Sequence, residues 1–197
     1  SCYGIPSNHP TNENDEIKPQ YPYALTKLFG EQLVIHWAKV YNMNNISLRL
    51  FNVYGLRSSI KSSYGSVFGI FLAQKLSKKP LTIVGDGNQT RDFVYVGDVV
   101  EALIKSAEKG IKGEIYNVGS GKETSVNHIA SIIGGDKCSI SKRARETERS
   151  LADIKKIKKQ LNWEPKTNIE DGINILLKNI NNWSEARVWK AKKLKKI

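Results

Sequence analysis

Apolar residues recur at helical spacing from residue 22 to about residue 42, and the segment is apolar on more than one side. Pro22 suits the first position of a helix, where the backbone N–H that proline lacks would have no partner. A helix that is apolar around much of its circumference packs against more than one surface. The pattern therefore predicts a long helix between a sheet and a further surface.

Short apolar runs alternate with helical repeats along the rest of the chain. Strands are expected at 46–51, 81–84, 90–95 and 114–118, an extended segment at 139–143, and helices at 67–79, 96–109, 125–133, from 152 to 161 and at 169–183. A glycine-containing turn separates the second and third strands, and the segment before the first helix is a polar, proline-containing loop. Strands that alternate with helices indicate an α/β fold.

The composition indicates a globular protein with a sizeable core. The chain has 197 residues, of which 40% are hydrophobic, and this length allows one or two domains. No apolar run approaches the ~20 residues that span a bilayer, and residues 1–15 lack the basic flank and apolar core of a signal peptide. The expectation is a soluble cytoplasmic protein.

The net charge of +12 is unevenly distributed along the chain. Residues 142–197 contain 16 basic and 7 acidic residues, whereas residues 1–141 carry a net charge of +3. A solvated face and tail accounts for most of this excess. Nucleic-acid binding by residues 142–197 is an alternative that no motif supports. Cys2 and Cys138 have no CxxC or metal-ligand spacing, which predicts free thiols and no metal site.

The candidate chemistry lies at the start of the first helix. Tyr23 and Lys27 are four residues apart, so their side chains lie on one helix face about 5–6 Å apart. A fixed cation beside a phenol favours the phenolate, which can take a proton from a substrate hydroxyl. The same spacing also occurs on ordinary solvated helices, so the pair needs support from the rest of the chain.

That support is an ordered series of motifs. They are Tyr3-Gly4, the Tyr23 and Lys27 pair, RLFNVYG at 49–55, GDGNQTRDFVYV at 85–96 and LNWEP at 161–165. In this order they resemble the extended short-chain dehydrogenase/reductases that modify nucleotide sugars, and within these the NAD-dependent epimerases. The resemblance covers nearly all of the chain. It implies the trailing part of a doubly wound, Rossmann-type parallel sheet and a small mixed α/β substrate-binding lobe.

The resemblance also implies a division of the chain. Residues 1–57, with 91–112 returning to them, would belong to the NAD-binding domain, and residues 58–197 would form mainly the substrate-binding lobe with a basic C-terminal tail. Relatives carry a glycine-rich phosphate-binding turn at the start of an N-terminal half. Gly119-Ser120-Gly121 has too few glycines to be that turn. The N-terminal dinucleotide-binding half is therefore expected to be missing and the isolated chain to be inactive.

By resemblance, the intact enzyme holds NAD, binds a UDP- or dTDP-linked hexose and is a homodimer to which the first helix contributes. Tyr23 is the base for the sugar 4-hydroxyl, and Lys27 steers it and bonds to the nicotinamide ribose. Phe51 and Val53 lie near the nicotinamide, and Asn52 contacts the substrate. From the residue pattern alone, Asn52 would simply end the preceding strand.

Three further residues are candidates for holding the nucleotide. The guanidinium of Arg91 matches the oxygen geometry of a pyrophosphate. Pairing with Asp86 or Asp92 would instead give Arg91 a structural role. Arg143 and Glu146 match in position an arginine and an acid that hold the nucleotide in relatives.

The reaction implied by the resemblance is a 4-epimerisation, an isomerase activity that passes through transient oxidation at C4. A 4,6-dehydratase or a sugar reductase of the same family would share Tyr23 and Lys27. Dehydratases carry a glutamate where this chain has Ser1, which argues against water elimination. The family's catalytic serine or threonine would fall just before Ser1. A nucleotide-sugar-binding or interaction module without turnover is the remaining alternative.

Overall fold

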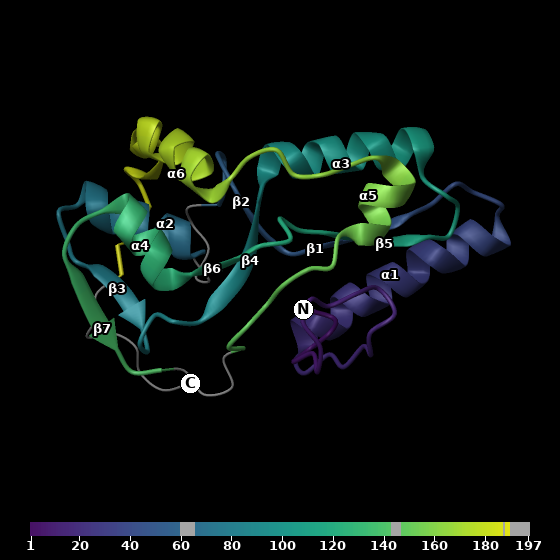
Figure 1. The fold of residues 1–197 in the computed structure, drawn as a ribbon, viewed down its shortest axis with the longest axis horizontal. Coiled ribbons are helices and arrows are strands. Elements are labelled where there is room, and N and C mark those ends of the chain that lie inside the picture. The colour runs from purple at the N-terminus through teal and green to yellow at the C-terminus, as the bar shows by residue number, and fades with distance from the viewer. Residues whose placement is uncertain (60–65, 143–146, 187, 190–197) are drawn as a thin grey trace. The chain divides into compact units, whose positions relative to one another are not determined.

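The structure is a computed structural model, and it describes residues 1–59, 66–142, 147–186 and 188–189 (Figure 1). The chain forms two compact units, and each is assembled from three separate stretches. Unit 1 consists of Ser1–Val53, Asp92–Glu123 and Ser150–Thr167. Unit 2 consists of Tyr54–Arg91, Thr124–Arg149 and Asn168–Ile197.

Helices and strands alternate along the described chain. They are α1 (Pro22–Val40), β1 (Ser47–Leu50), β2 (Asn52–Tyr54), α2 (Val67–Leu76), β3 (Leu81–Val84), β4 (Thr90–Tyr95), α3 (Val96–Lys109), β5 (Ile115–Val118), β6 (Glu123–Ser125), α4 (Val126–Ile133), β7 (Lys137–Ile140), α5 (Lys155–Leu161), α6 (Ile169–Lys178) and the 3-10 helix η1 (Ile180–Trp183). β1 pairs with β5 and β3 with β7, both in parallel. β2, β4 and β6 form a third sheet in that order. The predicted α/β class with parallel pairing is confirmed.

Segments with strong periodicity were predicted with their correct bounds. The helix α3 and the strands β3 and β4 begin and end where the pattern places them. Ser125 caps α4 as its side chain accepts a hydrogen bond from the backbone N–H of His128. Local sequence is therefore sufficient for these elements, because their apolar spacing and the turn or capping residues that flank them point to the same boundaries.

The predictions for several short elements were wrong. Asn52 does not end a strand but begins β2. Neither β2 nor β6 was predicted, since three residues are too few to display an alternating pattern. The extended segment expected at 139–143 lies earlier, as β7, and the helix expected from residue 152 begins at Lys155.

The core of unit 1 surrounds the parallel pair of β1 and β5. In Figure 1, α1 lies on one side of this pair and α3 and α5 lie on the other. The cluster of buried side chains comprises Val94, Val99, Ala102, Tyr116, Val118, Ile157, Leu161 and Trp163. This cluster lies on the side of α3 and α5. The helix that covers the other side is α1.

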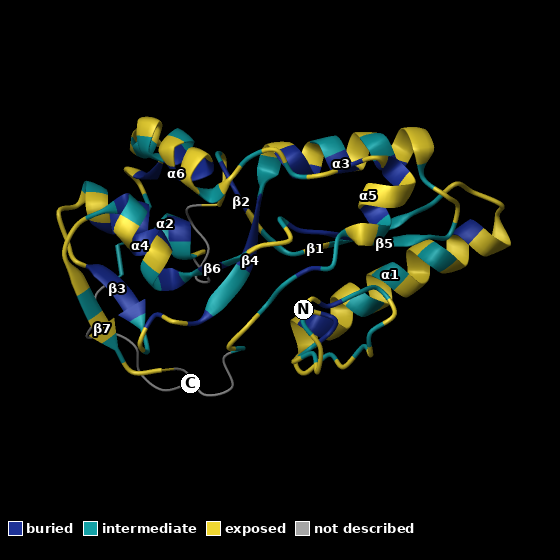
Figure 2. Cartoon of the chain, in the orientation of Figure 1, coloured by how far each residue is buried: buried dark blue, intermediate teal, exposed yellow. Residues whose placement is uncertain are grey.

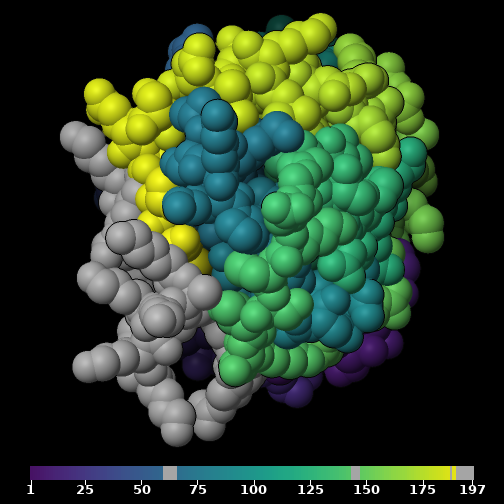
Figure 3. Space-filling model, turned by 90° about the vertical axis from the view of Figure 1, so that its left-hand side faces the viewer, coloured from purple at the N-terminus to yellow at the C-terminus, as the bar shows by residue number. Residues whose placement is uncertain are grey.

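Unit 2 has a separate core around the parallel pair of β3 and β7. α2 packs on β3, on α4 and on η1, and α4 packs on α6. Figure 3 shows residues of α2, α4 and α6 side by side on one face of this unit. The largest fully buried side chains here include Phe71, Leu72, Ile129, Ile133 and Ile173. No helix in the described parts of either unit is long and apolar enough to cross a membrane.

α1 packs on β1 through a narrow stripe of side chains. The stripe consists of Ala24, Leu28, Glu31, Ile35 and Ala38, which follow the alternating spacing of four and three residues that keeps one helix face toward a partner. Ala24 and Ala38 are the buried residues of this helix. Most of the helix surface is exposed or half-buried (Figure 2). Apolar packing therefore holds this long helix only weakly.

A nearly buried ion pair lies at the centre of the stripe. Arg49 of β1 donates two hydrogen bonds to the carboxylate of Glu31, from Nε to Oε2 at 2.8 Å and from Nη2 to Oε1 at 2.7 Å. The two side chains are 9% and 10% exposed. Burial opposes the charged guanidinium, but the interactions with Glu31 and Tyr3 together outweigh it, and the pKa of Arg49 is raised. The guanidinium is therefore charged in the folded protein.

The ion pair continues into a network that reaches the N-terminal loop. The Tyr3 hydroxyl accepts a hydrogen bond from Arg49 Nη1 at 2.7 Å and donates one to Asn117 Oδ1 at 2.7 Å. The side-chain amide of Asn117 donates to the carbonyl of Thr11, and its backbone N–H donates to Glu13. The network thus connects the loop, α1, β1 and β5.

The buried Tyr3 hydroxyl predicts a loss of stability at alkaline pH. Burial raises the pKa of Tyr3 from 10.0 to about 12. Between these values the unfolded chain releases the phenol proton while the folded chain keeps it, so the free energy of unfolding falls as the pH rises. Tyr3→Phe is expected to be less stable than the parent at pH 9, and this difference should shrink by roughly 1.3 kcal/mol at pH 11.

Chemical denaturation at the two pH values measures this difference. Tyr21→Phe is the matched control, because Tyr21 is exposed and its loss should give the same change in stability at both pH values. A difference between the parent and Tyr3→Phe that stays constant from pH 9 to pH 11 would contradict the neutral, buried phenol.

Candidate active site

Tyr23 and Lys27 project from the first two turns of α1. Lys27 Nζ lies 5.1 Å from the centroid of the Tyr23 ring, which is within the range of a cation–π contact. Tyr23 is 59% exposed, and Lys27 is also exposed. The phenol and the ammonium therefore lie together on an open surface of unit 1.

The position of this pair follows from how the helix begins. Pro22 occupies the first helical position as expected, and Tyr21, which precedes it, is extended and makes no side-chain capping bond. Tyr23 and Lys27 directly precede the stripe residues Ala24 and Leu28, and each residue turns a helix by about 100°. Lys27 therefore lies beside the stripe that contacts β1, and Tyr23 lies about 40° further toward the exposed side of the helix.

The residues that follow β1 belong to the same unit. Phe51 is half-buried, and its ring centroid lies 6.4 Å from that of Tyr3. The side-chain amide of Asn52 donates to the carbonyl of Asp92 at 3.3 Å, which ties β2 to β4. Val53 is exposed. The end of β1 therefore presents an apolar surface beside an amide that has a structural contact.

The carboxylate of Asp92 is an internal anchor that the sequence analysis missed. Asp92 is fully buried, and its oxygens accept hydrogen bonds from the backbone N–H groups of Ser120, Gly121 and Ala152 and from the Ser120 hydroxyl. Burial raises the pKa of Asp92, while these donors favour the carboxylate. A Cβ at Gly119 would lie 2.7 Å from Asp92 Oδ2, so a glycine is required there.

This contact explains the short glycine motif at 119–121. Two of its backbone N–H groups bind a carboxylate of the chain itself, as a phosphate-binding turn would bind a ligand. The motif is therefore occupied within unit 1, which agrees with rejecting it as a dinucleotide loop.

The candidate nucleotide-binding residues lie in unit 2 or outside the described residues. Arg91 Nη1 donates to the carbonyl of Thr90 at 2.8 Å and, at 3.5 Å, to the carbonyl of Glu148. Arg143 and Glu146 fall outside the residues that the structure describes. The structure thus places Arg91 but leaves the other two as expectations.

The carboxylates considered as structural partners of Arg91 have other partners. Asp86 accepts hydrogen bonds from the backbone and side-chain nitrogens of Asn88, and these bonds lower the pKa of Asp86. Asp92 is satisfied by the N–H groups of the turn at 119–121 and of Ala152. The alternative that Arg91 serves to neutralise one of these acids is therefore not supported.

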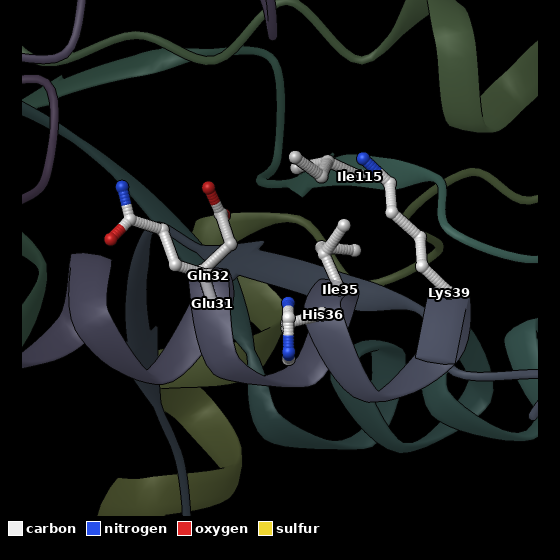
Figure 4. A pocket seen from close by; sticks show the side chains of 6 residues that line it. All are labelled: Glu31, Gln32, Ile35, His36, Lys39 and Ile115. Atoms are coloured by element: carbon white, nitrogen blue, oxygen red, sulfur yellow. The ribbon is translucent and has the colours of Figure 1, made fainter. Parts of the chain in front are cut away.

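A pocket of about 300 Å³ lies along α1 (Figure 4). Its lining residues are Glu31, Gln32, Ile35, His36, Lys39 and Ile115. By helical spacing, Gln32, His36 and Lys39 lie on the opposite side of the sheet-facing stripe from Lys27. The candidate chemistry is therefore not inside this pocket.

Tyr23 and Lys27 on α1, and the residues that follow β1, have the side-chain chemistry to hold part of a nicotinamide nucleotide. The phenol and the ammonium can bond to ribose hydroxyls, and the exposed Val53 and half-buried Phe51 offer an apolar surface for an aromatic ring. Among the residues that the structure describes, no group of His, Cys, Asp and Glu side chains could hold a metal ion.

Glu31 and Arg49 are the other residues that the sequence analysis missed. One signal in the sequence could have indicated them. Glu31 lies among the core-facing residues of α1, and Arg49 lies in the apolar strand β1. Burial of two opposite charges in adjacent elements implies that they pair. Sequence spacing does not show which buried charges meet, so the pair became visible only in the fold.

Comparison with known proteins places this geometry in a family. Residues 1–176 match the family model described as GDP-mannose 4,6 dehydratase. A protein of Methanocaldococcus jannaschii provisionally named as a UDP-glucose 4-epimerase is 40% identical over 189 residues, which cover 93% of this chain and 59% of that protein. The UDP-glucose 4-epimerase of Mycolicibacterium smegmatis is 32% identical over 179 residues, which cover 88% of this chain and 57% of that protein.

Solved structures resemble the fold over most of its length. The UDP-glucose 4-epimerase of Thermotoga maritima, solved with UDP-glucose, matches with a TM-score of 0.83 and 31% identity over 90% of this chain. The UDP-glucuronic acid 4-epimerase of Bacillus cereus, solved with UDP-glucuronic acid and NAD, matches with a TM-score of 0.82 and 31% identity over 92% of this chain. The chain spans 60% and 59% of the length of these two proteins.

Proposed function

The chain belongs to the GDP-mannose 4,6 dehydratase family, among the NAD-dependent nucleotide-sugar epimerases and dehydratases, and from this premise we propose that the protein at its natural length is a nucleotide-sugar 4-epimerase. Its substrate is a UDP- or dTDP-linked hexose, and it works in the cytoplasm. The observation that carries the proposal is the Tyr23–Lys27 pair in the first two turns of α1. Proteins named as 4-epimerases are among the relatives in both sequence and structure.

In this function Tyr23 moves the proton of the sugar 4-hydroxyl. Its oxygen accepts that proton when C4 is oxidised and returns a proton when C4 is reduced from the other face. The Lys27 ammonium, close to the phenol ring, stabilises the negative charge that develops on the phenol oxygen during the transfer. Between the two steps the 4-keto sugar rotates in the site and presents its other face. The returning hydride therefore inverts the configuration at C4.

NAD supplies the reversible hydride acceptor for this chemistry. Lys27 bonds to the nicotinamide ribose, and Phe51 and Val53 provide the apolar surface for the nicotinamide ring. Asn52 contacts the sugar, and Arg91, Arg143 and Glu146 hold the nucleotide. Lys27 therefore contacts both the cofactor and the Tyr23 phenol, and so fixes the position of one relative to the other.

We further propose that residues 1–57, with 91–112 returning to them, are the trailing part of a doubly wound sheet, and that residues 58–197 form mainly the substrate-binding lobe. Two facts support this: the β1–β5 sheet has only two strands among the described residues, and the relatives extend well beyond the matched region. An added dinucleotide-binding half would complete the cofactor site. Turnover is accordingly expected from the protein at its natural length and not from the 197-residue chain alone.

The second candidate function is a 4,6-dehydratase or a sugar reductase. The name of the family model supports a 4,6-dehydratase as a candidate. The 31% identity to the dTDP-4-dehydro-6-deoxyglucose reductase of Escherichia coli supports a sugar reductase. Ser1 stands where dehydratases have an acid, which supports epimerisation. The products separate these functions, because only epimerisation leaves the elemental composition and the oxidation state of the sugar unchanged.

Tyr23→Phe is the direct test of the proton-transfer assignment. We expect kcat for 4-epimer formation to fall by about 10²- to 10⁴-fold, because loss of a general acid–base group costs this much. NAD should remain bound, since the ring is retained. Product formation is measured by separating the two epimers of the UDP-hexose by chromatography.

The matched control is Tyr21→Phe, which removes an exposed hydroxyl two residues away and should keep the activity of the parent. A kcat of Tyr23→Phe within a factor of about 3 of the parent would remove Tyr23 from the proton-transfer role. A product that has lost water or gained two hydrogens would replace epimerisation by the second candidate function.

Arg91→Ala tests the nucleotide contact. Loss of a charge-assisted hydrogen bond costs about 1.5–3 kcal/mol, so we expect KM for the nucleotide sugar to rise roughly 10- to 100-fold with little change in kcat. Lys79→Ala, at an exposed cation of the same unit, is the control and should leave KM unchanged. If KM for Arg91→Ala matches that of the control, Arg91 has a structural role only.

We also propose that the protein forms a homodimer through the exposed face of α1. Large apolar side chains repeat there every four residues at Leu25, Phe29, Leu33 and Trp37, and they are 40–59% exposed. This spacing makes one continuous apolar stripe along the helix. Such a stripe pairs well with a copy of itself, because isologous contacts of this kind are the commonest in soluble oligomers.

Leu33→Asp is expected to convert a dimer into a monomer, since it puts a carboxylate at the centre of the stripe. Sedimentation velocity of the natural-length protein measures the oligomeric state. Gln32→Asp introduces the same charge on the pocket flank of α1 and should leave the dimer intact. A monomeric parent, or a dimer that survives Leu33→Asp, would show that this face is not the interface.

A further inference from the structure

We propose that the pair of Glu31 and Arg49 is a positioning device for the site at Tyr23 and Lys27. The pair fixes the rotation of α1 against β1, and thereby fixes where the phenol and the ammonium stand relative to the residues that follow β1. The inference rests on the function proposed above, and it adds two positioning residues to that site.

The spacing along α1 makes this connection direct. Tyr23, Lys27 and Glu31 are separated by four residues each, so each successive side chain is turned by only about 40° around the helix axis. Glu31 therefore follows Lys27 on nearly the same line and lies inside the sheet-facing stripe. A rotation of the helix that moved Glu31 would move Tyr23 and Lys27 with it.

Apolar packing determines this rotation only weakly, because Leu28 and Ile35 of the stripe are no more than half-buried. The buried residues of α1 are Ala24 and Ala38, which present a single methyl group each. Methyl groups on a sheet permit small rotations and shifts with little change in contact area. A large apolar residue at position 31 would stabilise the helix more simply, because burying charges costs desolvation. An ion pair at this position therefore contributes specificity of arrangement.

β1 holds the Glu31 carboxylate at several points. Besides the two bonds from Arg49, the Ser47 hydroxyl donates to Glu31 Oε2 at 3.3 Å. Ser47 and Arg49 are two residues apart on a strand, so both face α1. The planar fork of the guanidinium matches the carboxylate plane and resists both rotation and sliding of the helix.

The guanidinium is itself held from the other side. Arg49 Nη1 donates to the Tyr3 hydroxyl at 2.7 Å and to the carbonyl of Glu13 at 3.0 Å. Arg49 also stands two residues before Phe51, at the end of the same strand. The ion pair therefore joins the helix that carries the proton-transfer group to the strand end proposed to carry the cofactor and substrate contacts.

Kinetics of the natural-length protein separate positioning from plain stabilisation. In Glu31→Gln and Arg49→Lys we expect kcat per folded molecule to fall about 10- to 100-fold, because small misplacements of reacting groups have effects of this size. KM for the nucleotide sugar should change less than about 3-fold. Arg49→Lys keeps the positive charge and loses the fork, so it tests geometry in particular.

Glu101→Gln is the matched control. Glu101 forms ion pairs with Lys105 and Lys166 in the same unit but has no contact that holds α1. Its loss should leave kcat unchanged. A kcat per folded molecule of Glu31→Gln and Arg49→Lys equal to that of the control would overturn the positioning role.

A second measurement on the 197-residue chain does not depend on turnover. Ala38→Cys places a thiol at a buried position of the stripe, and its rate of alkylation, mapped by peptide mass spectrometry, reports the rotation of α1. We expect Glu31→Gln to increase this rate about 10-fold or more in the Ala38→Cys background. Cys138, which lies in unit 2, should react at the same rate in both proteins.

The outcomes separate the inference from the proposed function. If the parent protein forms no epimer, the proposed function fails, and the alkylation rates alone decide whether the ion pair fixes the helix. An Ala38→Cys rate that does not change with Glu31→Gln overturns the inference. If Ala38→Cys fails to fold, Ala24→Cys at the other buried end of the stripe takes its place and must show the same increase.

Discussion

The ion pair between Arg49 and Glu31 is the interaction on which the arrangement of unit 1 depends. It is nearly buried, and its charges are satisfied only because Ser47, Tyr3 and the carbonyl of Glu13 complete the hydrogen bonds. A buried charge that loses its partner costs several kcal/mol, roughly 3–5 in measured cases, so these segments assemble together or not at all. The long helix α1 is thus oriented mainly by polar contacts.

This orientation divides α1 into surfaces with separate roles. The stripe around Glu31 faces β1, the flank that carries Tyr23 and Lys27 is open to solvent, and the apolar side around Leu33 is exposed. A helix apolar on several sides would otherwise have no preferred rotation. One charged residue in the stripe settles which side carries the chemistry, and this is why a contact far from the reacting atoms matters for the proposed function.

The sequence predicts the elements whose local signals agree, and it predicts which side chains are adjacent when they lie within one helix. The bounds of α3 and the adjacency of Tyr23 and Lys27 are of this kind. The contacts that join distant segments could not be predicted. Glu31 and Arg49 are 18 residues apart, and the Asp92 carboxylate binds backbone groups 28 to 60 residues away. The spacing of apolar residues along the chain does not indicate such pairings, because they follow from how the helices and strands pack.

The fate of the hydrogen on C4 of the sugar tests the central claim most directly. The natural-length protein would be given NAD and UDP-glucose that carries deuterium at C4, and the product would be examined by mass spectrometry and NMR. The proposed mechanism predicts a 4-epimer that keeps its deuterium at C4, because the same hydride leaves and returns. Loss of deuterium from C4, or a dehydrated product in place of the epimer, would contradict the account.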